Sequence, residues 1–173
     1  MNNINSEYRQ NVGIVLLKNN LIFAGFRIDV PESSKTGWQM PQGGIDDGED
    51  VLTAGYRELY EETGIKKEKV KLIKILPDTI KYDFTPEVIA LMQKRNKRIG
   101  YIGKMYKGQE QYWIVFEFIG NDGDINLKPT DEPQEFSKFD WKSADFLVNN
   151  VFEMKQEVYK KVFQELYKLN IIS

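Results

Sequence analysis

The sequence contains no cysteine and no histidine among its 173 residues. Without cysteine the chain can form neither a disulfide nor a catalytic thiolate, a composition that suits a reducing cytoplasm. Without histidine it can hold neither a Ser-His-Asp triad nor most kinds of zinc site. Any proton transfer near neutral pH must therefore fall to a carboxylate, a lysine, a tyrosine or a metal-bound water.

Long apolar runs and an excess of charge of one sign are also missing. No apolar stretch approaches the roughly 18 residues of a membrane-spanning helix and no charged-then-apolar leader is present, so we expect a cytoplasmic protein without membrane contact. The net charge of −2 argues against a general nucleic-acid coat, and we expect no DNA partner. With 41% hydrophobic content and no shift in composition, residues 1–173 are predicted to form a single domain.

The sequence does contain a concentration of glutamates. Glu58, Glu61 and Glu62 fall within an arc of about 100° on a helix, so their carboxylates share one face. Such a run is usually a solvated helix face, but like charges this close repel one another, and a divalent cation would remove the repulsion. Oxygen ligands select hard ions, and Mg2+ typically completes its shell with substrate phosphates. The cluster therefore indicates phosphate chemistry.

The surroundings of this cluster favour a site over a solvated face. Gly43 and Gly44 precede the helix, where a backbone without side chains can approach a ligand closely. Gly64 stands where a left-handed helix stop belongs. Beside the carboxylates runs an apolar arc that should hold the glutamates near the body of the protein. Its members are Leu52, Gly55, Tyr56 and Leu59.

The periodicity of the chain predicts an α/β fold. A helix is predicted from about Asp50 to Glu62, with Asp47 or Asp50 as its N-cap. A second helix, over roughly Val151–Leu169, repeats apolar residues at intervals of three and four and should pack on a sheet. Strands are predicted near Val12–Leu17, Leu21–Phe26, Val70–Leu76, Ile80–Phe84, Gln111–Ile119 and Phe136–Trp141. Strands interleaved with two long helices indicate a sandwich with a mixed sheet.

The glycines, glutamates and arginine of this region have the spacing of a known motif, which they resemble: the Nudix box, G-x5-E-x7-R-E-U-x-E-E-x-G-U with U aliphatic. The chain matches it without a departure at Gly43, Glu49, Arg57 to Leu59, Glu61 to Glu62, and Gly64 to Ile65. The resemblance implies a Nudix hydrolase, with the α/β/α sandwich of that family. It also implies a metal-dependent enzyme that cleaves a nucleoside diphosphate linked to another group.

The same resemblance assigns roles to individual residues of the box. The cofactor would be Mg2+, with Mn2+ as a possible substitute. Glu49 would pair with Arg57 and steady the loop and the helix. The metal would be held by the catalytic carboxylates of Glu58, Glu61 and Glu62 and by a backbone carbonyl near Gly43.

Outside the box, the sequence resembles the bacterial RNA pyrophosphohydrolase branch of this family, whose members often also split dinucleoside polyphosphates. The similarity is carried by Tyr8–Val15, Trp38–Ile45 and Gly108–Trp113 and spans about residues 7 to 165. In that branch a glutamate far beyond the box supplies another metal and catalytic contact. Glu135 is the matching position, with one extra residue between it and the preceding proline, and Glu132 is the alternative.

The resemblance to this branch also implies three substrate-binding residues. Arg9 matches an arginine that contacts RNA 5′ phosphates, and Lys155 matches a lysine near the bound nucleotide. Gly44 belongs to the glycine turn that approaches the ligand. The alternative interpretation is that Arg9 and Lys155 are ordinary solvated charges.

A basic segment from Lys94 to Lys107 contains six lysines and arginines, no acid, and two interleaved tyrosines. Basic residues attract phosphates and aromatic rings stack on unpaired bases, so the segment suits an RNA 5′ end. An ordinary solvated loop explains the composition equally well.

The activity that these residues predict is attack of an activated water on a phosphorus of a polyphosphate chain. Glu61, Glu62 and Glu135 are the candidates for the general base. The leading substrate is the 5′-triphosphate end of RNA, whose conversion to a monophosphate would promote mRNA decay. A dinucleoside polyphosphate such as diadenosine tetraphosphate is the second possibility. An oxidised nucleoside triphosphate as substrate and a non-catalytic nucleotide sensor are further alternatives.

Overall fold

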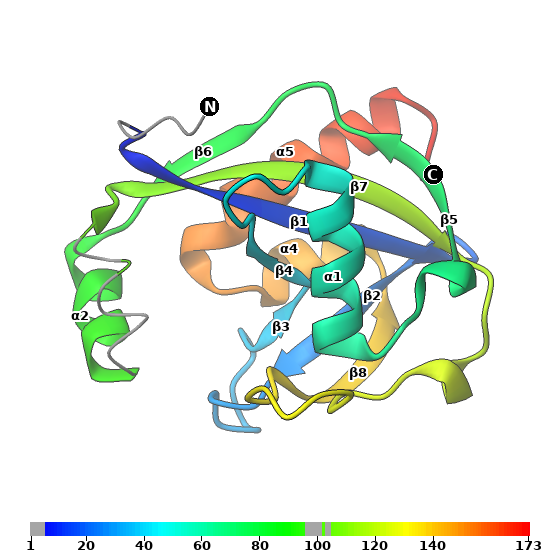
Figure 1. Cartoon of the computed structure of the whole chain (residues 1–173), viewed down its shortest axis with the longest axis horizontal. Coiled ribbons are helices and arrows are strands. Elements are labelled where there is room, and N and C mark those ends of the chain that lie inside the picture. Colours follow the sequence, from blue (N-terminus) through cyan, green and yellow to red (C-terminus); the bar gives the residue numbers. More distant parts are fainter. Residues whose placement is uncertain (1–5, 96–101, 103–104) are drawn as a thin grey trace.

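A mixed sheet forms the centre of the computed structural model, which describes residues 6–95, 102 and 105–173 (Figure 1). Its strands are β1 (Tyr8–Lys18), β2 (Leu21–Arg27), β3 (Trp38–Gln39), β4 (Gln42–Gly44), β5 (Val70–Ile75), β6 (Ile80–Asp83), β7 (Gly108–Phe118) and β8 (Phe136–Lys142). The main path runs β3-β2-β1-β7-β5, while β4 pairs with β1, β6 with β7 and β8 with β2. β1 and β7 run parallel and the other pairs are antiparallel.

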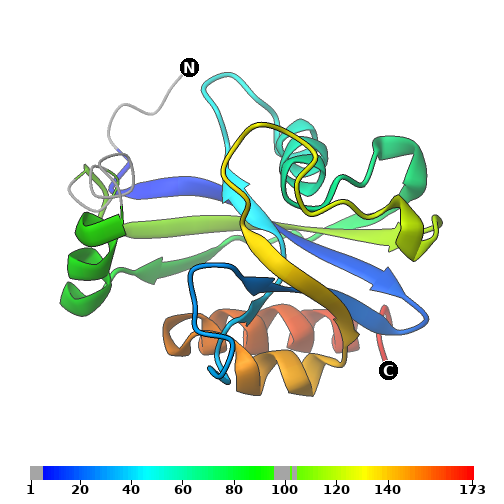
Figure 2. The same cartoon turned by 90° about the horizontal axis from the view of Figure 1, so that it is seen from below.

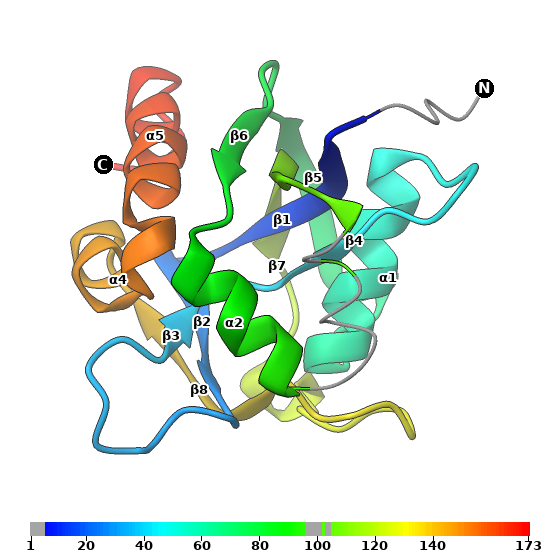
Figure 3. The same cartoon turned by 90° about the vertical axis from the view of Figure 1, so that its left-hand side faces the viewer.

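Helices cover both faces of this sheet. α1 (Val51–Thr63) lies on one face, and α4 (Ala144–Asn150) and α5 (Glu153–Lys168) lie on the other, as Figures 2 and 3 show. Side chains alternate along a strand, and β1 follows this rule: Val12 and Ile14 belong to the core beneath α1, and Val15 to the core beneath α5. This arrangement confirms the predicted α/β/α sandwich with a mixed sheet.

The helix that carries the glutamates begins and ends at its local signals. The Asp50 side chain accepts a hydrogen bond from the Thr53 N–H at 2.9 Å, so Asp50 is the N-cap and Asp47 is not. Gly64 closes the helix with a φ of 69°, a backbone conformation that favours glycine.

The second predicted helix was wrong at its start. Val151 is not helical: it is the C-cap of α4, a short helix that was not predicted, and α5 begins only at Glu153. The apolar repeat is confirmed within α5, where Val158, Val162 and Leu166 are buried against the sheet. α2 (Pro86–Arg95) was also missed; it lies at one end of the sheet.

The segment before α1 is more ordered than a glycine turn. Instead of a simple turn, Trp38–Gly44 contains the two short strands β3 and β4, which flank Met40 and Pro41. The Ile14 N–H donates to the Pro41 carbonyl at 2.9 Å, and Gln42 lies opposite Gly13 in the ladder. β4 is thereby held beside the middle of β1, directly under the glutamate helix.

No helix among the described residues combines the length and the apolar character needed to cross a membrane.

Candidate active site

Arg57 is the centre of an ion-pair network that joins α1 to the loop before it. Its Nε and Nη2 donate to the two carboxylate oxygens of Glu49, each at 2.8 Å, and Nη2 also donates to the Gly44 carbonyl at 2.8 Å. Its Nη1 donates to Glu58 at 2.7 Å and to Glu61 at 3.4 Å. The Glu49 hydrogen bonds raise the pKa of Arg57, and those of Arg57 hold the pKa of Glu49 below its ordinary value.

Glu58 is buried against the backbone of β4. Any side chain at Gly43 would overlap the Glu58 carboxyl group, which would then have to move. Burial raises the pKa of Glu58, and the hydrogen bond and charge of Arg57 oppose that shift. A carboxylate is thus held close to a main-chain strand, with Arg57 as a hydrogen-bonded cationic partner.

Glu62 lies one turn further along the same face and is 6% exposed. Its carboxylate accepts a hydrogen bond from the Gln42 N–H at 3.2 Å. Burial raises the pKa of Glu62 well above its ordinary value, and the negative charges of Glu135 and Glu58 raise it further. Glu62 therefore experiences the like-charge repulsion that a cation would relieve.

Glu135 comes to this cluster from the start of β8, far from α1 in sequence. Its carbonyl accepts a hydrogen bond from the Ile28 N–H at 2.9 Å, which holds the backbone, while its side chain stays exposed. Its charge acts on the pKa of Glu62, as expected for a member of the cluster. The alternative, Glu132, lies in the exposed loop before β8, where its N–H donates to the Thr130 hydroxyl at 3.2 Å.

The carboxylates provide hard oxygen donors of the kind that divalent cations select. In the arrangement shown, however, no three acidic side chains within the described ranges converge on one ion position. Arg57 draws the Glu58 and Glu61 carboxylates toward itself, and the Glu61 side chain is 37% exposed where that of Glu58 is 12% exposed. The donor set fits a divalent cation in chemistry.

Lys155 reaches the same place from the opposite layer of the sandwich. It is 8% exposed, and its Nζ donates to the side-chain carbonyls of Gln42 at 2.9 Å and Gln39 at 3.1 Å. Burial lowers the pKa of Lys155 to about 7; the nearby Arg27 adds to this shift, and Glu62 opposes it. Lys155 is therefore a buried amine, not the solvated charge of the alternative interpretation.

Arg27, Gln39 and Gln42 are parts of this site that the sequence did not single out. Arg27 forms two 2.8 Å hydrogen bonds to Asp29 and reaches Gln39 with Nη1 at 3.4 Å, and burial lowers its pKa. Gln39 and Gln42 flank Met40-Pro41 in a segment already singled out for its glycines. The sequence signal that could have identified them is this pair of glutamines, three positions apart and directly before the box.

The side chain of Arg9, on β1, lies against Gly44, the last residue of β4. Any side chain at Gly44 would overlap the Arg9 guanidinium. The charge of Arg9 also lowers the pKa of Glu58, so Arg9 is close enough to act on the carboxylate cluster. Of the basic segment Lys94 to Lys107, residues 96–101 and 103–104 lie outside the described residues, so its expected role is not addressed.

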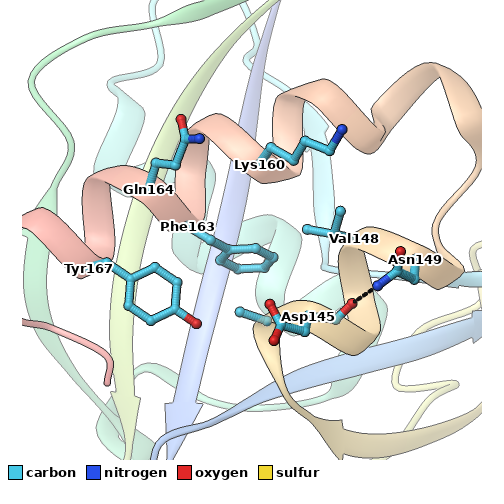
Figure 4. A pocket seen from close by; sticks show the side chains of 8 residues that line it. Asp145, Val148, Asn149, Lys160, Phe163, Gln164 and Tyr167 are labelled. Atoms are coloured by element: carbon cyan, nitrogen blue, oxygen red, sulfur yellow. Dashed lines mark hydrogen bonds between the residues drawn. The ribbon is translucent and has the colours of Figure 1, made fainter.

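A depression of about 180 Å3 lies elsewhere, between α4 and α5 (Figure 4). Phe163 and Val148 line its floor, and Lys160, Asp145 and Tyr167 stand around it. None of the residues predicted to act in the site lines this depression. The carboxylate cluster and the depression are separate features of the surface.

The NUDIX domain family matches residues 7–166. The RNA pyrophosphohydrolase of Dinoroseobacter shibae is 43% identical over 157 residues, 90% of this chain and 89% of that protein. The RNA pyrophosphohydrolase of Pelagibacter ubique is 41% identical over 169 residues, 97% of each. Among solved structures, a Caenorhabditis elegans Ap4A hydrolase in a binary complex is similar with a TM-score of 0.57 at 16% identity, covering 91% of this chain and 98% of that one. That likeness shows the fold alone.

Proposed function

The chain belongs to the Nudix family, and we propose that it removes pyrophosphate from the 5′-triphosphate end of RNA. The proposal is supported by the identity of 41% to 43% with RNA pyrophosphohydrolases over nearly the whole chain. It is also supported by the carboxylate cluster, in which Glu58 and Glu62 are buried and which is suited to the divalent cation that enzymes of this family generally use. Removal of the two outer phosphates would promote decay of the transcript in the cytoplasm.

The cation would be Mg2+, with Mn2+ as a possible substitute. Glu58, Glu61, Glu62 and Glu135 would hold it, with a contribution from the Gly43 carbonyl. When bound, the ion supplies positive charge that offsets the charges of the carboxylates and the polyphosphate. Arg57, which bonds to Glu49 through two hydrogen bonds, would keep the loop against the helix whether or not the ion is bound.

The chain's own residues position the reacting groups. Arg9, beside Gly44, is placed to bind phosphate oxygens of the substrate next to the carboxylates. Water attacks a phosphorus of the triphosphate, the phosphoanhydride bond breaks, and pyrophosphate leaves. Glu61, Glu62 or Glu135 would accept the water's proton, because these carboxylates lie at the cluster and the chain has no histidine. Lys155 lies behind β4, where its charge opposes the upward shift in the pKa of Glu62.

The single observation that carries this proposal is the complete set of box carboxylates around β4, within a chain closely similar to RNA pyrophosphohydrolases. The test is parallel hydrolysis, with Mg2+, of a 5′-triphosphorylated RNA with unpaired leading nucleotides and of diadenosine tetraphosphate. We expect faster release of pyrophosphate from RNA, and a loss of activity by orders of magnitude in Glu58→Gln. Faster cleavage of the dinucleotide would move the substrate to that class, and cleavage of neither would favour a nucleotide sensor.

A further inference from the structure

Gln42 connects the two layers of the sandwich at the carboxylate cluster. Its backbone N–H donates to Glu62 at 3.2 Å, on the side of α1. Its side-chain carbonyl accepts two hydrogen bonds, from Lys155 Nζ at 2.9 Å and from Gln111 Nε2 at 3.3 Å. Because the Lys155 amine donates to it, the oxygen end of the Gln42 amide faces Lys155. Gln42 is therefore held in one orientation from two directions.

Gln111 is itself fixed within the sheet. It is 1% exposed, and its amide nitrogen also donates to the side-chain carbonyl of Asn11 at 2.9 Å. Both hydrogens of that amide are thus used. Asn11 lies opposite Gln111 in the parallel ladder and is 1% exposed as well. The buried amide of Gln111 on β7 is thus bonded both to the buried amide of Asn11 on β1 and to the half-buried amide of Gln42 on β4.

We propose that Gln111 and Lys155 are positioning residues, which clamp the Gln42 side chain so that the Gln42 N–H holds the Glu62 carboxylate in place for the metal. This inference rests on the proposed function, since it concerns the same site. Neither residue is hydrogen-bonded to Glu62 in this network: Gln111 acts through Gln42, and Lys155 acts both through Gln42 and by its charge. The outer partners of metal-binding side chains commonly change metal affinity or activity by about 10- to 100-fold when they are removed.

This role differs from the one that the sequence assigns to Lys155. A lysine that binds substrate presents its ammonium to the nucleotide, so its loss raises KM. The Lys155 ammonium instead faces two side-chain carbonyls of its own chain. Its loss, like that of Gln111, is expected to lower kcat and weaken metal binding more than it raises KM.

β7 offers a matched control two residues away. Gln109 is also buried, at 7% exposure, and lies on the same side of the strand as Gln111. Its side-chain carbonyl accepts a hydrogen bond from the Tyr82 hydroxyl at 2.5 Å, a contact that does not involve Gln42. Gln109→Met and Gln111→Met each remove one buried amide from the same strand. Of the two amides, that of Gln111 is connected to Glu62 through Gln42, whereas that of Gln109 bonds to Tyr82.

The experiment measures the binding of Mn2+ alone to the full-length protein, by paramagnetic resonance titration, for the wild type and both variants. We expect Gln111→Met to weaken Mn2+ binding by about 10-fold and Gln109→Met by less than about 2-fold. Thermal unfolding in metal-free buffer accompanies each titration. Equal losses of affinity in the two variants, or no loss in Gln111→Met, would overturn the proposal.

Kinetics on triphosphorylated RNA give the second readout. Gln111→Met should lower kcat by about 10-fold with KM within about 2-fold of the wild type, and raise the Mg2+ concentration needed for half-maximal rate. A rise in KM alone would show that the network serves substrate binding, which overturns the positioning role. If the wild type hydrolyses no RNA, the proposed function fails, whereas the Mn2+ titration still tests the positioning network.

Discussion

Lys155→Met should change how folding stability depends on pH. Burial lowers the pKa of Lys155 to about 7 in the folded protein, against an ordinary value of 10.5. Below about pH 7 both the folded and the unfolded chain carry the charged amine, so the cost of burying it is fully present. Between about pH 7 and 10.5 the unfolded chain binds more protons than the folded one, and stability rises with pH.

The magnitude follows from the size of that shift. One pKa unit corresponds to about 1.4 kcal/mol, so the wild type should gain about 2 kcal/mol of unfolding free energy from Lys155 between pH 7 and pH 9. Because Lys155 is only 8% exposed, solvent screening reduces this value little. Methionine has nearly the same length and no charge, so Lys155→Met should lack this gain. It should also be relatively most stabilised below pH 7, where the wild type carries the buried charge.

The assay is urea unfolding at pH 7, 8 and 9 in the presence of a chelator, for the wild type, Lys155→Met and Lys160→Met. Lys160 lies on the same helix, is 48% exposed and pairs with Glu157, so its variant should follow the wild-type slope. Glu62 and Glu135 remain in all three proteins. Parallel curves for the wild type and Lys155→Met would refute the conclusion that this amine is held near neutrality by burial.

Two further predictions concern the carboxylates. Gly43→Ala should push the Glu58 carboxyl away from β4 and lower hydrolysis at least about 10-fold, as measured by pyrophosphate release. The control is Gly48→Ala, whose added methyl group meets no neighbour. It should lower only the folding stability, because Gly48 has a φ of 79°. Normal activity in Gly43→Ala would show that Glu58 is not needed against that strand. Glu135→Gln should lower kcat by about 10-fold or more and reduce Mn2+ affinity, while Glu132→Gln stays near wild type; the reverse order would assign the distal ligand to Glu132.

The long elements of this fold were predictable because their signals are local. Asp50 caps α1 through a hydrogen bond to a residue three positions away, and Gly64 ends it through its own backbone conformation. The long strands β1 and β7 have apolar runs that mark them without any knowledge of their neighbours. β3 and β4, with two and three residues, are too short to have a period, and they exist as strands only because β2 and β1 pair with them.

For the site, the sequence by itself determined which carboxylates share a face of α1, because the helical period alone places Glu58, Glu61 and Glu62 together. It also determined the Glu49–Arg57 pairing through the family resemblance, and the ion pair is present at 2.8 Å. Only the tertiary structure decided that two of the three glutamates are buried and that Glu58 and Glu61 are both bonded to Arg57.

The tertiary structure also decided the surroundings of Glu62. Glu135, Lys155 and Gln111 come from three separate elements and lie far from α1 in the chain. No period or local spacing connects them, since their proximity depends on strand order, on the parallel register of β1 and β7, and on the packing of α5 beneath the sheet. Burial there lowers the pKa of Lys155 and raises that of Glu62, and burial is a property of the assembled layers, which a list of residue types does not contain.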